Sequence, residues 1–210
     1  MKKRKIVLFI FIFINCFYAK AQDKDYIEFN DRNNILHGVY LGGDVGFGRI
    51  KKNETFSAGM KLAYVYNKKM ELGIAIKALT SDLRSVDGTF GEDYDLFVIY
   101  GGLHSENIII RSSNFHLSFP FLIGIGFTEI SGPSITNKDA TLIAEPGVGV
   151  LYNLTKYIQF EGAIKYRFSS PIDPIPNTLD NINGVSINFG AKIGVFNLGK
   201  NRYKKNPPKE

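Results

Sequence analysis

The chain has 210 residues, which is enough for one domain with a sizeable core, and a formal net charge of +6. Five of its 26 basic residues and none of its acidic residues lie within residues 1–21, so the remainder is nearly neutral. This balance does not indicate a nucleic-acid-binding protein. The single cysteine, Cys16, excludes a disulfide within the chain.

The first 21 residues have the pattern of a cleaved signal peptide. A basic KKRK stretch precedes an apolar run at 6–14, and Ala-Lys-Ala at 19–21 has the small-x-small pattern of a cleavage site. The apolar run is too short for a membrane-spanning helix, which needs ~20 residues. A lipoprotein signal ending at Cys16 is the alternative, but Asn15 stands where such a signal requires a small residue.

The rest of the chain alternates between apolar and polar residues with a period of two. Eight such segments follow in chain order, at 39–48, 57–66, 70–77, 94–110, 115–127, 142–152, 158–168 and 185–195. The last is the cleanest, since its odd positions are all apolar and its even positions are polar or glycine. A strand places successive side chains on opposite faces, so each segment predicts a strand with one apolar face. The fourth segment does not show which face is which.

The connections between these segments differ in length in a regular way. The first, at 49–55, is short; tight turns are predicted at 67–69, 111–114 and 153–156, and longer polar loops at 80–93, 130–139 and 169–183. Tight turns at one rim and longer loops at the other are typical of an outer-membrane barrel with both termini in the periplasm. We therefore predict an eight-stranded antiparallel transmembrane β-barrel.

The polar faces carry charged residues of both signs. These are Asp44, Lys61, Glu71, Lys77, Glu145, Glu161, Lys165, Arg167 and Lys192. A soluble sandwich also alternates and would point such charges outward, but the frequent glycines on the same faces suit the narrow lumen of a small barrel. We expect these charges to form a paired network that plugs the lumen. A gated pore, opened by breaking a pair at Glu145 or Glu161, is the alternative.

Two segments resemble a known family. The stretch at 146–168 (PGVGVLYNLTKYIQFEGAIKYRF) and the closing FGAKIGVF at 189–196 are similar to the small outer-membrane β-barrel proteins of the Bacteroidota, which include the PorT-type secretion accessory barrels. The resemblance covers residues 38–196. It implies a barrel fold and allows a role as an accessory subunit of an outer-membrane secretion or assembly complex.

No catalytic or cofactor-binding signature stands out in the sequence. His116 and Ser118 have the His-x-Ser spacing that lipid A deacylases use, but they follow a tight turn and should lie near the periplasmic rim, whereas those enzymes act at the outer leaflet. A lipid A-modifying hydrolase is therefore a disfavoured alternative. The three histidines and the acidic residues show no metal-ligand spacing, so neither a metal nor a cofactor is expected.

The chain thus divides into a signal peptide (1–21), a periplasmic segment (22–37), the barrel (38–198) and a basic periplasmic tail (199–210). We expect a non-enzymatic outer-membrane protein with a structural or binding role, whose extracellular loops are available for recognition. The expected partners are outer-membrane lipid and an outer-membrane or periplasmic protein, and no nucleic acid.

Overall fold

The computed structural model describes residues 37–83, 94–111, 115–131, 136–172 and 179–196. The chain divides into two units, Met1–Asn33 and Asn34–Glu210, and the described residues all belong to the second. The predicted signal peptide and basic tail lie outside the described residues, as does the periplasmic segment apart from its last residue, His37, which begins the first strand. Among the described residues, no helix is long and apolar enough to cross a membrane.

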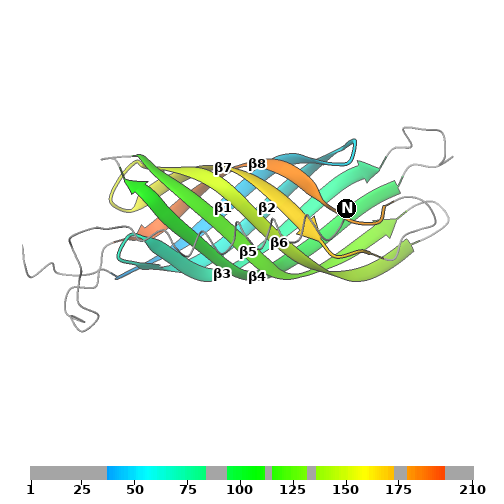
Figure 1. Cartoon of the computed structure of the whole chain (residues 1–210), viewed down its shortest axis with the longest axis horizontal. Coiled ribbons are helices and arrows are strands. Elements are labelled where there is room, and N and C mark those ends of the chain that lie inside the picture. Colours follow the sequence, from blue (N-terminus) through cyan, green and yellow to red (C-terminus); the bar gives the residue numbers. More distant parts are fainter. Residues whose placement is uncertain (1–36, 84–93, 112–114, 132–135, 173–178, 197–210) are drawn as a thin grey trace, which may run out of the picture. The chain divides into compact units, whose positions relative to one another are not determined.

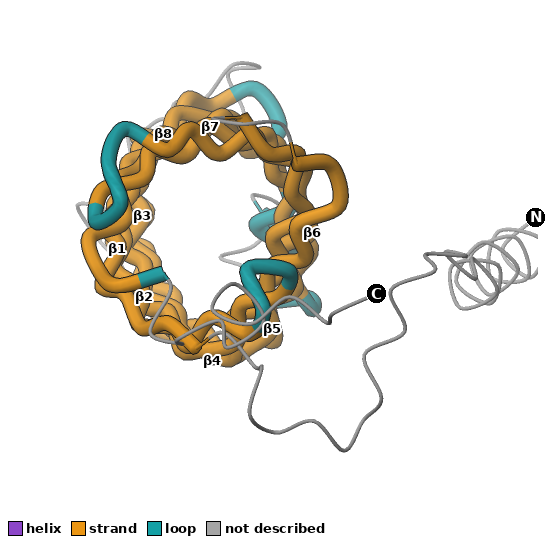
Figure 2. The backbone as a smooth tube through the Cα atoms, turned by 90° about the vertical axis from the view of Figure 1, so that its left-hand side faces the viewer, coloured by secondary structure: helices purple, strands orange, loops and turns teal. Residues whose placement is uncertain are grey.

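Eight antiparallel strands close into a barrel (Figures 1 and 2). In chain order they are β1 (His37–Ile50), β2 (Asn53–Tyr66), β3 (Met70–Leu83), β4 (Tyr94–Arg111), β5 (Phe115–Ser131), β6 (Thr136–Asn153), β7 (Ile158–Ser169) and β8 (Gly184–Val195). Each strand pairs with the next, and β8 closes the ring by pairing with β1 from Val39↔Val195 to Ile50↔Gly184. The predicted barrel is confirmed, and the sandwich alternative is wrong.

The outer wall is apolar, as a wall that faces lipid must be. Large side chains such as Leu103 and Ile193 are 67% and 62% exposed, which a protein surrounded by water on this face would not sustain over a whole barrel. Aromatic side chains gather outward near the two rims. They are Tyr64, Tyr66, Phe115, Tyr152 and Tyr157 towards the tight turns, and Phe47, Phe56, Phe97, Phe127 and Phe168 towards the loops.

The residue types in the tight turns suit the backbone conformations that these turns adopt. In the turn between β2 and β3, Asn67 and Lys68 both have positive φ angles of 49° and 54°, and the Lys69 amide donates a hydrogen bond of 2.9 Å to the Tyr66 carbonyl. Two successive positive φ angles match the right-handed twist of a hairpin. The first connection is shorter than predicted, because β1 and β2 leave only Lys51 and Lys52 between them.

The loop predicted at 130–139 is wrong, because β5 and β6 continue through most of it. They remain paired up to Ser131↔Thr136, and β3 likewise runs to Leu83 into the loop predicted at 80–93. This part of β5 and β6 extends beyond the last residue pair between β6 and β7, which is Ile143↔Ser169. Polar residues such as Thr128, Glu129, Lys138 and Asp139 predominate in this part of β5 and β6, although Ile130 is buried in the lumen, so the sequence has the pattern of a loop while the ladder continues.

These extensions form a projection beyond the shorter half of the barrel. β4, β5 and β6 have 18, 17 and 18 residues, whereas β7 and β8 have 12 each. The projection, as we define it, consists of residues 94–97, 128–131 and 136–140. It stands at the rim that carries the longer loops.

The structure assigns the two faces of β4. Leu96, Val98 and Tyr100 point inward and are buried, whereas Phe97 and Ile99 point outward. Both faces are apolar in this half of the strand, which explains why alternation failed to separate them. A register shift between Ile108 and Ile110 further breaks the pattern.

Glycines on the inner face make room for the charged side chains that cross the lumen. A Cβ atom at Gly59 would lie 2.7 Å from Cγ of Lys77, and one at Gly147 would lie 2.8 Å from Cγ of Lys165. Both distances are shorter than carbon atoms tolerate. The long basic side chains therefore lie flat against the wall where it has no side chain of its own.

A closed barrel of this kind should resist SDS until it is heated. We expect unheated and boiled samples to migrate differently on an SDS gel, because the unheated barrel keeps its hydrogen-bonded ring and stays compact. Identical mobility of the two samples would contradict closure by the β1–β8 pairing.

Candidate functional site in the barrel lumen

The lumen is the one region where the structure concentrates polar chemistry. The nine charged residues singled out in the sequence are all buried there, each at most 9% exposed, and they contact one another across the barrel. The pair of Lys77 on β3 and Glu145 on β6, for example, joins two strands that are not neighbours in the wall. These contacts form two layers.

The first layer, which we call the acid-rich layer, consists of Glu71, Glu106, Glu161, Lys61 and Lys192. The Nζ atom of Lys192 lies 2.8 Å from Oε2 of Glu71 and 2.7 Å from Oε2 of Glu106, and 3.6 Å from Oε2 of Glu161. Lys61 pairs with Glu161 and lies 3.7 Å from Glu106. Lys192 has no exposed surface, so its charge is neutralised entirely by these partners.

The second layer, which we call the base-rich layer, consists of Asp44, Glu145, Lys77, Lys165 and Arg167. Glu145 lies at its centre, with Nζ of Lys77 at 2.8 Å and Nε of Arg167 at 3.6 Å. Asp44 contacts Lys77 at 3.3 Å and Lys165 at 3.9 Å. Lys165 also lies 3.5 Å from Glu161, and this contact joins the two layers.

The network as a whole has equal numbers of acidic and basic side chains, although neither layer does by itself. Among the described residues the lumen buries five acidic and five basic side chains, which are those of the two layers. The acid-rich layer has one surplus carboxylate and the base-rich layer one surplus cation. Buried charges are tolerated when they are paired and hydrogen-bonded, and removal of one partner leaves a costly uncompensated charge.

Three members of the site were missed in the sequence. Glu106 lies on β4, whose faces the alternation did not separate. Tyr40 and Tyr100 were hidden among the apolar residues, but their hydroxyls donate hydrogen bonds to Glu71 at 2.6 Å and to Glu145 at 2.7 Å. The sequence did hold a signal that Glu106 points inward: it lies an even number of residues from Tyr100 and His104, and all three side chains point into the lumen.

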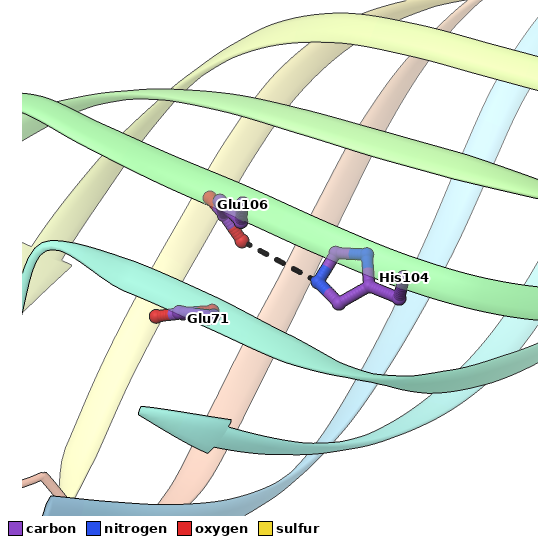
Figure 3. A group of neighbouring side chains, drawn as sticks. All are labelled: Glu71, His104 and Glu106. Carbon is purple, nitrogen blue, oxygen red and sulfur yellow. Dashed lines mark ion pairs between the residues drawn. The ribbon is translucent and has the colours of Figure 1, made fainter. Parts of the chain in front are cut away.

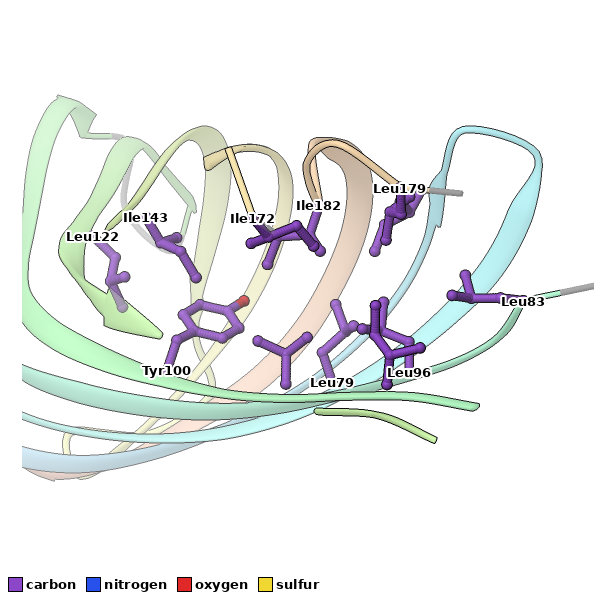
Figure 4. Packing of buried hydrophobic residues seen from close by; sticks show 12 residues of the cluster. Leu79, Leu83, Leu96, Tyr100, Leu122, Ile143, Ile172, Leu179 and Ile182 are labelled. Atoms are coloured by element: carbon purple, nitrogen blue, oxygen red, sulfur yellow. The ribbon is translucent and has the colours of Figure 1, made fainter. Parts of the chain in front are cut away.

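An apolar cluster fills the lumen on the loop side of the network (Figure 4). It consists of Ile50, Leu79, Leu83, Leu96, Val98, Tyr100, Leu122, Ile130, Ile143, Ile172, Leu179 and Ile182. Ile172, Leu179 and Ile182 come from the connection between β7 and β8, so the described parts of this connection reach into the mouth of the barrel. Its described part is held by hydrogen bonds of Ser169 with Asn183 and Ile182.

A smaller apolar cluster lies on the turn side. Tyr40, Ala63 and Val65 are buried there, and Phe196 stacks on Tyr40 with ring centroids 5.7 Å apart. Within the network, the cavity beside Asp44, Lys77 and Glu145 measures about 20 Å³, which has room for a single water molecule. The described lumen thus holds paired charges between two apolar clusters.

The His116 and Ser118 pair does not form a catalytic arrangement. Both side chains point inward near the turn between β4 and β5, but Nε2 of His116 is hydrogen-bonded to the Asn153 amide at 2.7 Å. The hydroxyl of Ser118 is buried and finds no hydrogen-bond partner in the described part of the chain. A base-activated nucleophile requires a hydrogen bond between the two residues.

The chain is similar in structure to small outer-membrane β-barrels. Neisserial surface protein A matches it with a TM-score of 0.56 at 11% identity, over 75% of this chain and 96% of that chain. This likeness shows the fold. No protein-family model and no curated protein matches the chain.

Two further solved structures are more distant. The N-terminal β-barrel domain of Pseudomonas aeruginosa OprF has a TM-score of 0.44 at 10% identity, over 75% of this chain and 96% of that chain. Ail of Yersinia pestis has a TM-score of 0.40 at 11% identity, over 76% and 98% of the two chains.

The buried network makes a prediction about stability. Lys192→Met should lower the free energy of unfolding by about 3–5 kcal/mol, because Glu71 and Glu106 would lose their shared cation. Lys138→Met is the matched control, since Lys138 pairs with Glu129 at an exposed position and its loss should cost at most about 1 kcal/mol. Urea unfolding of both variants in phospholipid vesicles measures the difference. Equal destabilisation would show that the buried network is no more important than a surface pair.

The packed lumen also predicts that the barrel does not conduct ions. In planar lipid bilayers the protein should give no current steps, and Glu145→Gln should also stay silent, because the apolar cluster of Figure 4 still fills the mouth. A porin of known conductance serves as the positive control. Current steps in the variant alone would support the gated pore, and steps in the unmodified protein would contradict a sealed lumen.

Proposed function

We propose that the protein is a non-enzymatic outer-membrane β-barrel with a structural or binding role. The observation that carries this proposal is the combination of an apolar outer wall and a lumen filled by paired charges between two apolar clusters. Such a barrel offers neither a pathway nor a substrate pocket inside, so any contact with other molecules takes place on its outer wall and rims.

The proposal includes the expected location and orientation. The signal-peptide pattern at 1–21 supports export, and the apolar wall with its aromatic rims supports insertion into the outer membrane. In this orientation the tight turns and both termini are periplasmic, and the projection stands at the extracellular face.

The projection is the surface that best suits a binding role. It carries strands beyond the apolar part of the wall, and a groove at its base, between the aromatic rim and the projection, is lined by Phe97, Ile99, Phe127, Thr128, Glu129, Lys138, Asp139 and Ala140. The groove joins aromatic side chains to an exposed ion pair, Lys138 with Glu129 at 3.3 Å. Aromatic residues flanked by charges are typical of protein recognition surfaces.

A second candidate function is that of an accessory subunit in an outer-membrane secretion or assembly complex, as the resemblance to the PorT-type barrels of the Bacteroidota suggests. The projection supports this role as well, because a rigid surface outside the membrane can dock a larger partner. The geometry at His116 and Ser118 gives no support to a lipid A hydrolase.

A mild-detergent pull-down of a tagged copy from native outer membranes, followed by mass spectrometry, distinguishes the two roles. A stoichiometric protein partner would identify a subunit of a complex, and a barrel that purifies alone would favour the structural role. If the projection is the docking surface, reversal of its charges by Glu129→Lys or Lys138→Glu should release the partner. Lys156→Glu, an exposed change in the turn between β6 and β7, should keep it. Retention in all three variants would exclude the projection.

A further inference from the structure

We propose that the groove at the base of the projection binds one membrane lipid whose headgroup carries both a phosphate and a primary amine, as phosphatidylethanolamine does. The groove measures about 430 Å³, which is within the range of sites that bind small molecules. It lies on the outer face of β4, β5 and β6. The inference rests on the proposed function, since a lipid reaches this groove only if the wall lies in the outer membrane.

The apolar half of the groove is a row of side chains with a gap. Ile99 pairs with Phe127 and Phe127 pairs with Ala140, so these three outward side chains lie side by side across three strands. Ile99 and Phe127 are large and exposed, whereas Ala140 offers only a methyl group. The gap beside Phe127 is continuous with the apolar wall, because the next outward residue of β6 is Leu142. An acyl chain in this gap gains close contacts with the ring of Phe127 that a smooth wall does not offer.

The next row towards the loops carries charge. Phe97 pairs with Glu129 and Glu129 pairs with Lys138, which places one aromatic, one acidic and one basic side chain in line. The Nζ atom of Lys138 lies 3.3 Å from Oε2 of Glu129, and their side chains are 71% and 40% exposed. Such an exposed pair contributes little to stability, so a ligand can open it at low cost. A phosphate can then bind Lys138 while an ammonium binds Glu129, at the depth where aromatic residues mark the membrane interface.

The charge around the groove favours a headgroup with an amine. Asp139 also lines the groove, and one of its oxygens accepts the amide of the next residue at 2.7 Å. One row further towards the loops, Asp95 on β4 is the direct cross-strand partner of Asp82 on β3, and both are exposed. Together with Glu129, these residues place four carboxylates near the single ammonium of Lys138. A purely anionic headgroup would add to this surplus of negative charge, whereas an amine reduces it.

The inner face of the same two strands shows what such a pair of acidic residues requires. Glu71 and Glu106 are also direct cross-strand partners on β3 and β4, and Figure 3 shows them inside the barrel. There the ammonium of Lys192 lies 2.8 Å from one carboxylate and 2.7 Å from the other. Neither Asp82 nor Asp95 has an ion pair with a described residue, although like charges placed opposite each other destabilise a pair of strands. On the outer face the cation therefore has to come from the surroundings, and a lipid amine at headgroup depth supplies it.

The two halves of the groove together define the ligand. The apolar row takes a chain and the charged row takes a headgroup with charges of both signs, so neither a free headgroup nor a free fatty acid meets both demands. In a lipid, chain and headgroup are joined in the same order as the two rows follow each other along the wall, from the hydrocarbon towards the loops. A lipid bound in this way leaves the tip of the projection to a protein partner.

The experiment is native mass spectrometry of the full chain in detergent, after addition of phosphatidylethanolamine or of phosphatidylglycerol with the same acyl chains. We expect a single retained lipid, with phosphatidylethanolamine retained about three- to fivefold more than phosphatidylglycerol, the ratio that one exposed ion pair provides. Ala140→Phe, or Ala140→Leu if the first variant does not fold, fills the gap and should lose the retained lipid. Ala58→Phe is the matched control, because Ala58 is also exposed on the outer wall, on β2, and this variant should keep the lipid. Heat-dependent migration on an SDS gel shows that each sample has folded.

A change in the charged row gives an independent readout. Glu129→Gln should remove the preference for phosphatidylethanolamine, whereas Glu54→Gln, which also changes an acid in an exposed ion pair, should keep it. Equal retention of the two lipids by the unmodified chain would overturn the proposal, and so would equal retention of phosphatidylethanolamine by the Ala140 and Ala58 variants. Neither outcome bears on the proposed function, whose pull-down reports on protein partners. Failure of that pull-down would in turn not change the retention of lipid by the purified chain.

Discussion

The charged groups buried inside this barrel find their partners within the same chain, because the wall around them faces lipid. The backbone meets this constraint by closing β8 onto β1, and the side chains meet it by pairing across the lumen. Lys192 shows how tightly the two are connected. It lies on the strand that closes the ring, and its ammonium reaches Glu71 and Glu106 on the opposite side. Closure and neutralisation thus depend on the same strand.

The inside of the barrel has two regions with different physics. The half towards the turns is held by charges and hydrogen bonds, which are directional and define a single arrangement. The half towards the loops is held by aliphatic packing, which excludes water without regard to direction. Tyr100 belongs to both, since its ring packs in the apolar cluster and its hydroxyl binds Glu145. The described lumen therefore joins two kinds of packing at this tyrosine.

The architecture was predictable from the sequence because the membrane imposes a strict alternation on the strands that cross it. Segments such as 185–195 display this alternation without exception. It fails where the environment changes. In β4, Leu96 and Val98 face an apolar lumen, so both faces look alike; at the projecting ends of β5 and β6, polar residues predominate and the sequence resembles a loop. The boundaries of the alternation therefore mark where the lumen turns apolar and where the lipid ends.

The polar site was predictable only in part, for a different reason. Alternation identifies which residues point inward, but not which of them meet, since partners such as Lys77 and Glu145 are set by the curvature and stagger of the whole wall. Glu106 was overlooked because its strand could not be oriented. The tyrosines were overlooked because a buried aromatic residue shows its hydroxyl's role only when its partner is known.

The position of Lys192 on β8 has a consequence for the order of assembly. In chain order, all three carboxylates of the acid-rich layer precede the ammonium that lies between them, on β3, β4 and β7. An open sheet that lacks β8 therefore holds these carboxylates without their central cation, and water must hydrate them. Their dehydration is deferred to the last step, when β8 arrives and the interior becomes dry. Without Lys192 of β8, such an open sheet has five acidic but only four basic side chains of the network, so pairing of β8 with β1 also completes the charge balance.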